Sequence, residues 1–177
     1  MSKPKLLHIK TGGTIDGCVP EYVEIEQIAN LFNDSVNFKK HIMQSFKAGV
    51  EYSEFEVCKK DSRAINTSDR NIICKVVERE YYNGTKDFLI THGTFTMGET
   101  GIFLLDNLSD EVKEGCSVVL TGAMYPWNVF GSDAPMNLGA SVSQLISGHA
   151  KGVWICMHGK LFDPRKTSKD VENRIFE

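Results

Sequence analysis

The sequence predicts an α/β protein built on a mostly parallel sheet, and three observations lead to this prediction. Short apolar runs recur along the chain, and most of them lack the alternation that a strand with one hydrated face would show. Between these runs lie segments in which apolar residues recur at helical spacing. Short loops connect the two kinds of segment. We therefore expect a doubly wound sheet, Rossmann-like or flavodoxin-like, with helices on both faces.

Five segments are predicted to be strands, because each is a short run of mainly apolar or β-favouring residues. In chain order they are Lys5–Lys10, Phe55–Lys59, Asp87–Thr91, Ser117–Thr121 and Gly152–Met157. Most of these runs are typical of strands that are buried on both faces of a parallel sheet.

Four segments between the strands are predicted to be helices. They are Glu24–Asn33, Thr67–Tyr82, Thr96–Leu108 and Asn137–Ser147. The second has the strongest signal, because apolar residues such as Ile73 and Val77 recur there at helical spacing. We expect Ser68 to cap the first turn of this helix.

Length and composition are typical of one globular domain, which we expect to span residues 1–177. The net charge is -3 and no basic stripe is visible, which argues against nucleic acid as a partner. No apolar run approaches the length of a membrane helix, and the first apolar segment is too short for a secretory signal. Five scattered cysteines argue against a disulfide framework and a zinc site. We expect a cytoplasmic protein without a membrane partner.

Four unusual loops follow four of the predicted strands. In chain order they contain Thr11-Gly12-Gly13-Thr14, Asp61-Ser62, Thr91-His92-Gly93-Thr94 and Thr121-Gly122-Ala123. The carboxyl ends of parallel strands meet at one edge of an open α/β sheet, and ligands bind at that edge. We therefore expect the four loops to form one site.

Four kinds of chemistry are candidates for this site. The phosphate-binding motifs G-x-x-x-x-G-K-[ST] and G-x-G-x-x-G are absent after the first strand, although its glycine loop alone remains compatible with an anion nest of backbone N–H groups. The serine-hydrolase motif G-x-S-x-G and the metal motif H-E-x-x-H are also absent. A threonine nucleophile remains, which needs a base or lysine and oxyanion donors. Glycines beside the threonines would let backbone N–H groups approach a substrate carbonyl.

Five stretches of the chain, in this order, resemble the asparaginase family: TGGTID, KKDSRAI, LITHGTFTMGET, VVLTGAM and GKLFDPRKTSKDVENRIFE. The resemblance runs from Leu6 to Glu177 and is greatest for the short, single-domain members of the family. It implies hydrolysis of the side-chain amide of L-asparagine to L-aspartate and ammonia, without metal or cofactor. It also implies that residues 1–177 form one domain of the N-terminal asparaginase type, with no C-terminal domain.

The resemblance implies catalytic roles for four residues. Thr14, in TGGTI, matches the primary nucleophile, and Thr94, in THGT, matches the second catalytic threonine, which is often placed near an attacking water. Lys169, in RKTSK, matches the lysine that pairs with this second threonine. Tyr22, in PEYVE, falls where the first loop of the family supplies a tyrosine near the nucleophile.

Six further residues are expected to bind the substrate. Ser62, in KDS, matches the serine that holds the α-carboxylate of the substrate in the family. The other five lie in the same loops, and they are Gly13, Asp61, Gly93, Phe95 and Ala123.

Two departures from the family pattern bear on the substrate. The motif THGTDTM reads THGTFTM here, so Phe95 replaces an aspartate that pairs with the substrate ammonium and belongs to a Thr–Lys–Asp relay in the family. The family's S-x-D-M reads Ser62-Arg63-Ala64-Ile65. Asp16 and Glu99 are the acidic residues nearest in sequence that would compensate.

Three functions are therefore compared. The leading one is an asparaginase-like amidohydrolase that acts through Thr14 on L-asparagine or a related small amide. The alternative is a degenerate member of the family that binds a small acid or amide without efficient turnover, and Phe95 is the residue that separates these two. The third is an interaction module without a ligand, against which the joint presence of Thr14, Ser62, Thr94 and Lys169 argues. The resemblance also implies a homodimer or homotetramer.

Overall fold

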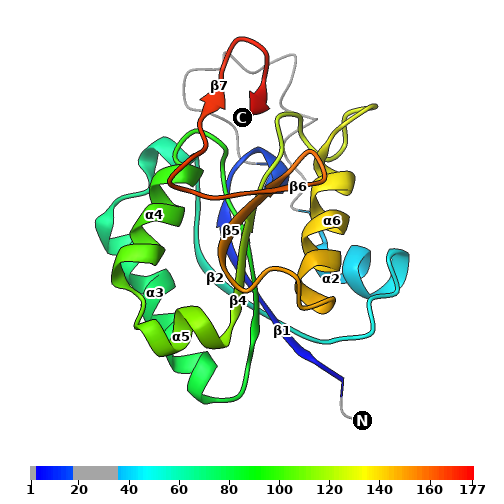
Figure 1. The fold of residues 1–177 in the computed structure, drawn as a ribbon. Coiled ribbons are helices and arrows are strands. Elements are labelled where there is room, and N and C mark those ends of the chain that lie inside the picture. The colour runs from blue at the N-terminus through cyan, green and yellow to red at the C-terminus, as the bar shows by residue number, and fades with distance from the viewer. Residues whose placement is uncertain (1–2, 18–35) are drawn as a thin grey trace.

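A computed structural model of the chain describes residues 3–17 and 36–177 (Figure 1). Within these residues, six strands form one sheet in the order β2-β1-β3-β4-β5-β6. The strands are β1 (Lys5–Gly12), β2 (Glu51–Lys60), β3 (Asp87–Thr91), β4 (Ser117–Thr121), β5 (Gly152–Met157) and β6 (Lys160–Phe162). The first five pair in parallel, and β6 pairs antiparallel to β5. The prediction of a doubly wound, mostly parallel sheet is confirmed.

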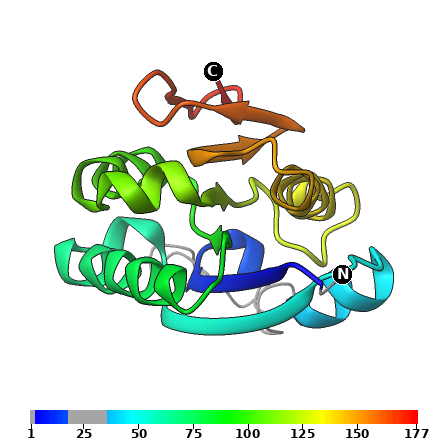
Figure 2. The ribbon, with the colours of Figure 1, turned by 60° about the horizontal axis from the view of Figure 1, so that its bottom comes forward.

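Helices cover both faces of this sheet, as Figure 2 shows. On one face lie α3 (Thr67–Tyr82), α4 (Met97–Asn107) and α5 (Asp110–Gly115). On the other face lie α6 (Ala134–Ile146) and the short α2 (Phe38–Lys40), which continues into one π-helical turn (His41–Ser45). None of the helices in the described part of the chain is long and apolar enough to cross a membrane.

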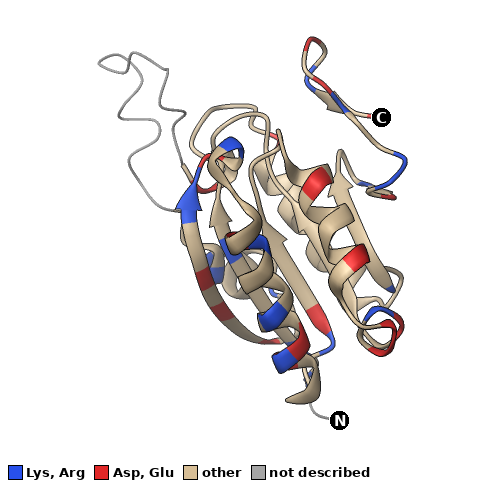
Figure 3. Ribbon diagram, turned by 90° about the vertical axis from the view of Figure 1, so that its left-hand side faces the viewer, with Lys and Arg blue, Asp and Glu red and all other residues tan. Residues whose placement is uncertain are grey.

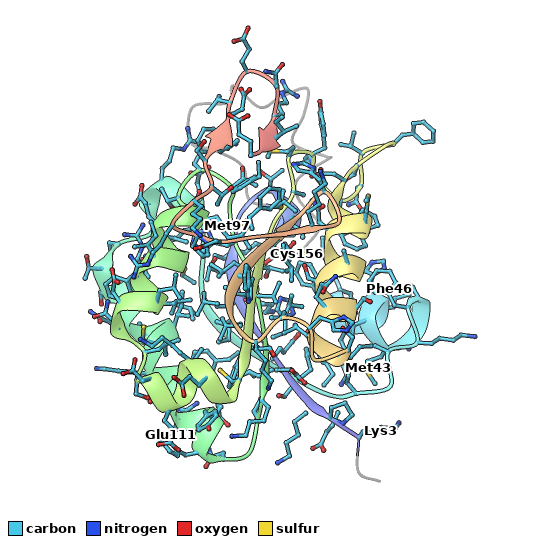
Figure 4. The ribbon with its side chains drawn as sticks, in the orientation of Figure 1. Lys3, Met43, Phe46, Met97, Glu111 and Cys156 are labelled. Atoms are coloured by element: carbon cyan, nitrogen blue, oxygen red, sulfur yellow. The ribbon has the colours of Figure 1, made fainter. Side chains whose placement is uncertain are left out.

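Two apolar clusters, one on each face of the sheet, form the core. Successive side chains of β1 alternate between them, so that Leu6 joins the α6 side and Leu7 the α3 and α4 side. Met97 and Cys156, which Figure 4 labels, are both fully buried and belong to different clusters. Burial on both faces explains why the central strands read as continuous apolar runs.

The edge strand β2 differs from the prediction. It begins at Glu51, four residues before the predicted start, and most of its side chains are exposed or half-buried. Figure 3 shows the acidic positions along this strand and the lysines at its carboxyl end. A charged edge strand resists pairing with other sheets, so its polar residues obscure the apolar run that defines the central strands.

The helix predictions were right in place and shifted at their ends. The helix predicted over Thr96–Leu108 spans Met97–Asn107, and Thr96 and Leu108 are its flanking cap residues. The helix predicted over Asn137–Ser147 begins earlier, at Ala134, where a proline occupies the first turn. The predicted helix Glu24–Asn33 lies outside the described residues. The short elements α2, α5 and β6 were not predicted.

The helix over Thr67–Tyr82 has the predicted bounds but a different cap. Its N-cap is Asn66, whose side-chain oxygen accepts hydrogen bonds from the backbone N–H groups of Ser68 and Asp69 at 2.8 and 3.2 Å. The Asp69 carboxylate accepts the N–H of Asn66 in return, at 3.1 Å, and completes a capping box. The prediction of Ser68 as the cap was wrong, because the helix already includes that residue.

This capping box predicts unequal effects of two neighbouring substitutions. Asn66→Ala removes the acceptor of two N–H groups and should lower the free energy of unfolding by about 1 kcal/mol. Ser68→Ala, inside the first turn and exposed, should change it by less than about 0.5 kcal/mol. Urea unfolding of both variants and the wild type measures the difference. A larger loss for Ser68→Ala than for Asn66→Ala would contradict the assignment.

Candidate active site

The direction of the winding reverses between β1 and β3. From β1 the chain goes out to the edge strand β2, and it returns to β3 on the other side of β1. In open α/β sheets, ligands bind at the carboxyl ends of the strands at such a switch point. The loops that begin at Gly13 and at His92 leave β1 and β3 at this point.

Glycines let these loops meet backbone to backbone. A methyl group at Gly13 would lie 2.4 Å from the backbone nitrogen of Gly93. A methyl group at Gly93 would in turn lie 2.8 Å from Cβ and Oγ of Ser62, in the loop after β2. Gly13 also has φ +79°, a conformation that favours glycine. The loops after β1, β2 and β3 therefore stack in direct contact, and no larger residue fits at the two glycine positions.

This contact changes the role expected for Gly13. Its N–H group was expected to approach a substrate carbonyl, but it donates to the carbonyl of Lys60 at 2.9 Å. The glycine therefore serves close packing between loops. Thr14 follows it directly and begins a single 3-10 turn (Thr14–Asp16), in which its side chain is half-buried.

Buried polar groups fix the strand ends beneath the site. Thr11 Oγ1 donates to the carbonyl of Thr91 at 2.9 Å and so joins the ends of β1 and β3. His8, fully buried in β1, contacts the Tyr52 hydroxyl through Nδ1 at 2.8 Å and Thr91 Oγ1 through Nε2 at 2.9 Å. His8 is therefore a core residue with both ring nitrogens satisfied. Burial, together with the nearby charge of Lys10, lowers the pKa of His8 to about 3.

His92 holds the loop after β3 from below. A carbonyl can only accept, so His92 Nδ1 donates to the carbonyl of Gly93, at 2.7 Å. His92 Nε2 then accepts from the Thr100 hydroxyl at 2.9 Å, while Thr100 Oγ1 accepts from Arg70 Nε at 3.1 Å. Burial lowers the pKa of His92 to about 4, against the opposing effect of the Gly93 hydrogen bond. The neutral ring thus orients the loop, as its position suggested.

The C-terminal segment brings Lys169 to the site. It ends in the two-stranded hairpin of β7 (Lys169–Asp170) and β8 (Ile175–Phe176), which lies above the carboxyl ends of the sheet (Figure 1). Lys169 Nζ donates to Thr94 Oγ1 at 2.8 Å. The two residues are 75 positions apart in the chain, and their predicted pairing in space is confirmed. Burial lowers the pKa of Lys169, and Arg63 and Arg174 lower it further.

Phe95 lies among cations. Its ring centroid is 3.7 Å from Lys169 Nζ and 4.5 Å from Arg63 Cζ, within the range of cation–π contacts. Asp61 accepts two side-chain hydrogen bonds from Arg63, both at 2.8 Å, and these hold the pKa of Asp61 below its usual range. The predicted substrate residues Asp61 and Phe95 are thus joined through Arg63.

Two other predicted substrate residues, Ser62 and Ala123, are buried. Ser62 is 1% exposed, its Oγ accepts the N–H of Thr96 at a long 3.4 Å, and its hydroxyl lies below the surface. Ala123 lies in the loop after β4, with its side chain packed in the apolar cluster on the α6 side. Tyr22 lies outside the described residues.

Neither acidic residue expected to compensate for Phe95 is available as a free carboxylate. Asp16 is 4% exposed, and burial raises the pKa of its carboxyl group. Glu99, on α4, accepts a hydrogen bond from Arg70 at 2.8 Å and forms an ion pair with it.

Asn137 is a positioning residue that the sequence did not predict. Asn137 is fully buried on α6, where Nδ2 donates to the carbonyl of Gly122 at 3.0 Å and Oδ1 accepts the N–H of His158 at 2.9 Å. His158 Nε2 accepts the N–H of Phe176, at 3.3 Å, from the tail that carries Lys169. One amide therefore ties the loop after β4 to the turn on which the tail rests. In the sequence, the only sign of this role was that Asn137 is a polar residue inside an amphipathic helix.

Fold and site together define an α/β protein with a small-ligand site at its switch point, where a threonine hydroxyl and a lysine amine share a hydrogen bond. A model of the asparaginase N-terminal domain matches residues 5–175, so the chain belongs to the asparaginase family.

Relatives agree with this assignment. The chain is 30% identical over 177 residues to the probable L-asparaginase 4 of Schizosaccharomyces pombe, covering 97% of this chain and 48% of that protein. It is 31% identical over 158 residues to the probable periplasmic L-asparaginase of Haemophilus influenzae, covering 88% and 38%. The crystal structure of a probable cytoplasmic L-asparaginase from Campylobacter jejuni superposes with a TM-score of 0.78 at 26% identity, covering 94% and 50%. The chain thus spans half or less of the length of these relatives.

The two buried neutral histidines predict sensitivity to acid. The pKa values of His92 and His8, about 4 and about 3, lie below the value of about 6.5 in an unfolded chain. Below pH 6.5 the unfolded state therefore binds more protons, and the free energy of unfolding falls as the pH falls. Each histidine contributes a slope that grows to at most about 1.4 kcal/mol per pH unit as the pH falls from 6.5 towards its folded pKa.

Denaturant unfolding between pH 6.5 and 5 measures this slope. His92→Gln, which keeps a neutral amide donor and acceptor, should remove about one histidine's share of it. A free energy of unfolding that stays constant over this range would show that these rings titrate in the folded protein as they do in the unfolded chain.

Proposed function

We propose that this chain carries the reacting groups of an asparaginase-like amidohydrolase, which hydrolyses the side-chain amide of L-asparagine or a related small amide to an acid and ammonia. The observation that carries the proposal is the 2.8 Å hydrogen bond from Lys169 to Thr94 beside the Gly13–Gly93 contact, because Thr14 and Thr94 directly follow these glycines. Membership in the asparaginase family supports it.

In the proposed reaction, Thr14 Oγ attacks the amide carbon, and its proton passes to the pair formed by Thr94 and Lys169. The C–N bond then breaks, and the leaving nitrogen takes up a proton and departs as ammonia. Water attacks the resulting threonine ester, releases the acid and restores the Thr14 hydroxyl. The net reaction consumes one amide and one water.

The surroundings of Lys169 suit the acceptor of this proton. Burial lowers its pKa, and the charges of Arg63 and Arg174 act in the same direction. A lowered pKa increases the fraction of neutral amine near pH 7, which is the form that accepts a proton. Thr94 is 5% exposed and Lys169 is half-buried, so the hydrogen bond between the two is partly buried.

Three further properties are proposed for this protein: its oligomeric state, a role for Tyr22 and its location. We propose that the protein forms a homodimer or homotetramer and that Tyr22 has the catalytic role that the family resemblance implies. A cytoplasmic location also stays a prediction, since one relative is named cytoplasmic and another periplasmic.

Phe95 favours the alternative function, a protein that binds a small acid or amide without efficient turnover. Its phenyl ring provides no carboxylate for a substrate ammonium or for a relay with Lys169. Ammonia release from amides separates the two functions, because a binding protein releases none.

The proposed nucleophile predicts a selective loss of activity. Thr14→Ala should lower ammonia release from any amide substrate roughly a thousandfold or more, because no other group forms the ester. The fold should persist, since the side chain is only half-buried. Thr67→Ala, an exposed threonine at the start of α3, is the matched control and should keep full activity. More than a few per cent of residual activity in Thr14→Ala would exclude this nucleophile.

The proposed base predicts a second loss. Lys169→Met keeps the length of the side chain and removes the amine, and it should lower kcat by about a hundredfold or more. Lys166→Met, in the same tail but 82% exposed, should leave kcat unchanged. Steady-state ammonia release over pH 6 to 10 measures both, and the rise of wild-type kcat with pH, as Lys169 loses its proton, should be absent in Lys169→Met. Equal effects of the two substitutions would contradict a role for Lys169.

A further inference from the structure

We propose that the substrate of this site is an anionic amide without an ammonium group, such as the monoamide of a dicarboxylic acid, whose free carboxylate is held near Lys169 and Arg63. The proposal rests on the proposed function and names the substrate class of the same site.

The structure has room for a small acid beside two of the proposed reacting groups, Thr94 and Lys169. Thr94, Phe95 and Lys169 line a groove of about 280 Å³ between the start of α4 and the C-terminal tail. Pro164 and Phe176 of the tail form its apolar side. A ligand in this groove therefore contacts the hydroxyl of Thr94, the phenyl ring and the amine together.

Among the described residues, cations gather on the Phe95 side of this groove. Lys169 and Arg63 both contact the ring of Phe95, and Arg174 is close enough to depress the pKa of Lys169. The opposing carboxylate is Asp61, which already accepts two side-chain hydrogen bonds and one backbone hydrogen bond from Arg63. Glu99, on the rim, is paired with Arg70. Lys169 and Arg63 thus place positive charge at the Phe95 ring with Arg174 nearby, and each of the two neighbouring carboxylates, Asp61 and Glu99, is paired with an arginine.

A positively charged site discriminates strongly between an amino acid and its des-amino analogue. The ammonium of L-asparagine would meet like charges, and Coulomb repulsion in a partly dry site is large. The ring of Phe95 does not offer that ammonium a cation–π contact, because Lys169 Nζ and Arg63 Cζ already lie 3.7 and 4.5 Å from the ring centroid. A free carboxylate, by contrast, would relieve the mutual repulsion of these cations.

The test compares L-asparagine with succinamic acid, which has the same amide and carboxylate but no ammonium. Ammonia release gives kcat/KM for both compounds. The wild type should prefer succinamic acid, with a high KM for L-asparagine. Phe95→Asp should shift the preference towards L-asparagine by roughly ten- to a hundredfold, because a charge-assisted hydrogen bond to the ammonium is gained.

Two control variants separate the charge at this position from other effects. Phe95→Leu removes the ring without adding a charge and should keep the wild-type preference. Phe130→Asp adds a carboxylate at a fully exposed aromatic residue in the loop before α6 and should also keep it. The proposal is overturned if the wild type prefers L-asparagine, or if Phe95→Asp leaves the ratio of the two kcat/KM values unchanged.

Binding of the products keeps this test independent of turnover. Calorimetric titration of wild type and Phe95→Asp with succinate and with L-aspartate needs no catalysis. If no variant releases ammonia from either amide, the proposed function fails, and the titration then decides the ligand class alone. Tighter binding of succinate than of L-aspartate by the wild type, reversed in Phe95→Asp, supports it, whereas a preference of the wild type for L-aspartate overturns it.

Discussion

The backbone contact between Gly13 and Gly93 is the constraint on which the site depends. A methyl group at Gly13 would lie 2.4 Å from Gly93, and one at Gly93 would lie 2.8 Å from Ser62, so the loops from three strands can stack only when both positions lack a side chain. Because each glycine precedes a threonine, the same contact holds two hydroxyl-bearing residues on adjacent loops. The strand order also contributes to this arrangement. It makes β1 and β3 neighbours in the sheet at the switch point, so the loops that follow the two strands lie side by side.

The residues beneath the site are buried and neutral, whereas those above it are cationic. Beneath it, His8, His92 and Thr100 are buried, and each has its hydrogen bonds satisfied while the two rings stay neutral. Such a network is rigid, because any displaced member would leave a buried polar group without a partner. Above it, Lys169 and Arg63 are cationic and come from segments that pack on the surface of the fold. Rigid geometry and tunable charge are therefore supplied by different parts of the chain.

The sequence predicted those features that depend on local pattern. Runs of apolar residues located the five parallel strands, and paired threonines and glycines located the site at their carboxyl ends. It failed where the outcome depends on which of several possible partners forms the hydrogen bond, near or distant in the chain. Asn66 caps α3 in place of Ser68 because Asp69 closes the box behind it, and the N–H of Gly13 is consumed by Lys60. The contact of Lys169 with Thr94 was predicted only through a resemblance, since a lysine in a polar tail carries no signal of burial.

Phe95 links the electrostatics of the site to its chemistry. A carboxylate at this position would stabilise the protonated form of the adjacent Lys169 and raise its pKa. The phenyl ring, 3.7 Å from Nζ, provides a weaker attraction and also displaces water from the amine. With Asp61 engaged by Arg63, burial and the neighbouring cations dominate, and the pKa of Lys169 falls. A phenyl ring at this position thus provides no carboxylate to pair with an ammonium and none to raise the pKa of the lysine. Under the proposed function, one residue therefore bears both on the ligand and on the fraction of neutral amine at Lys169.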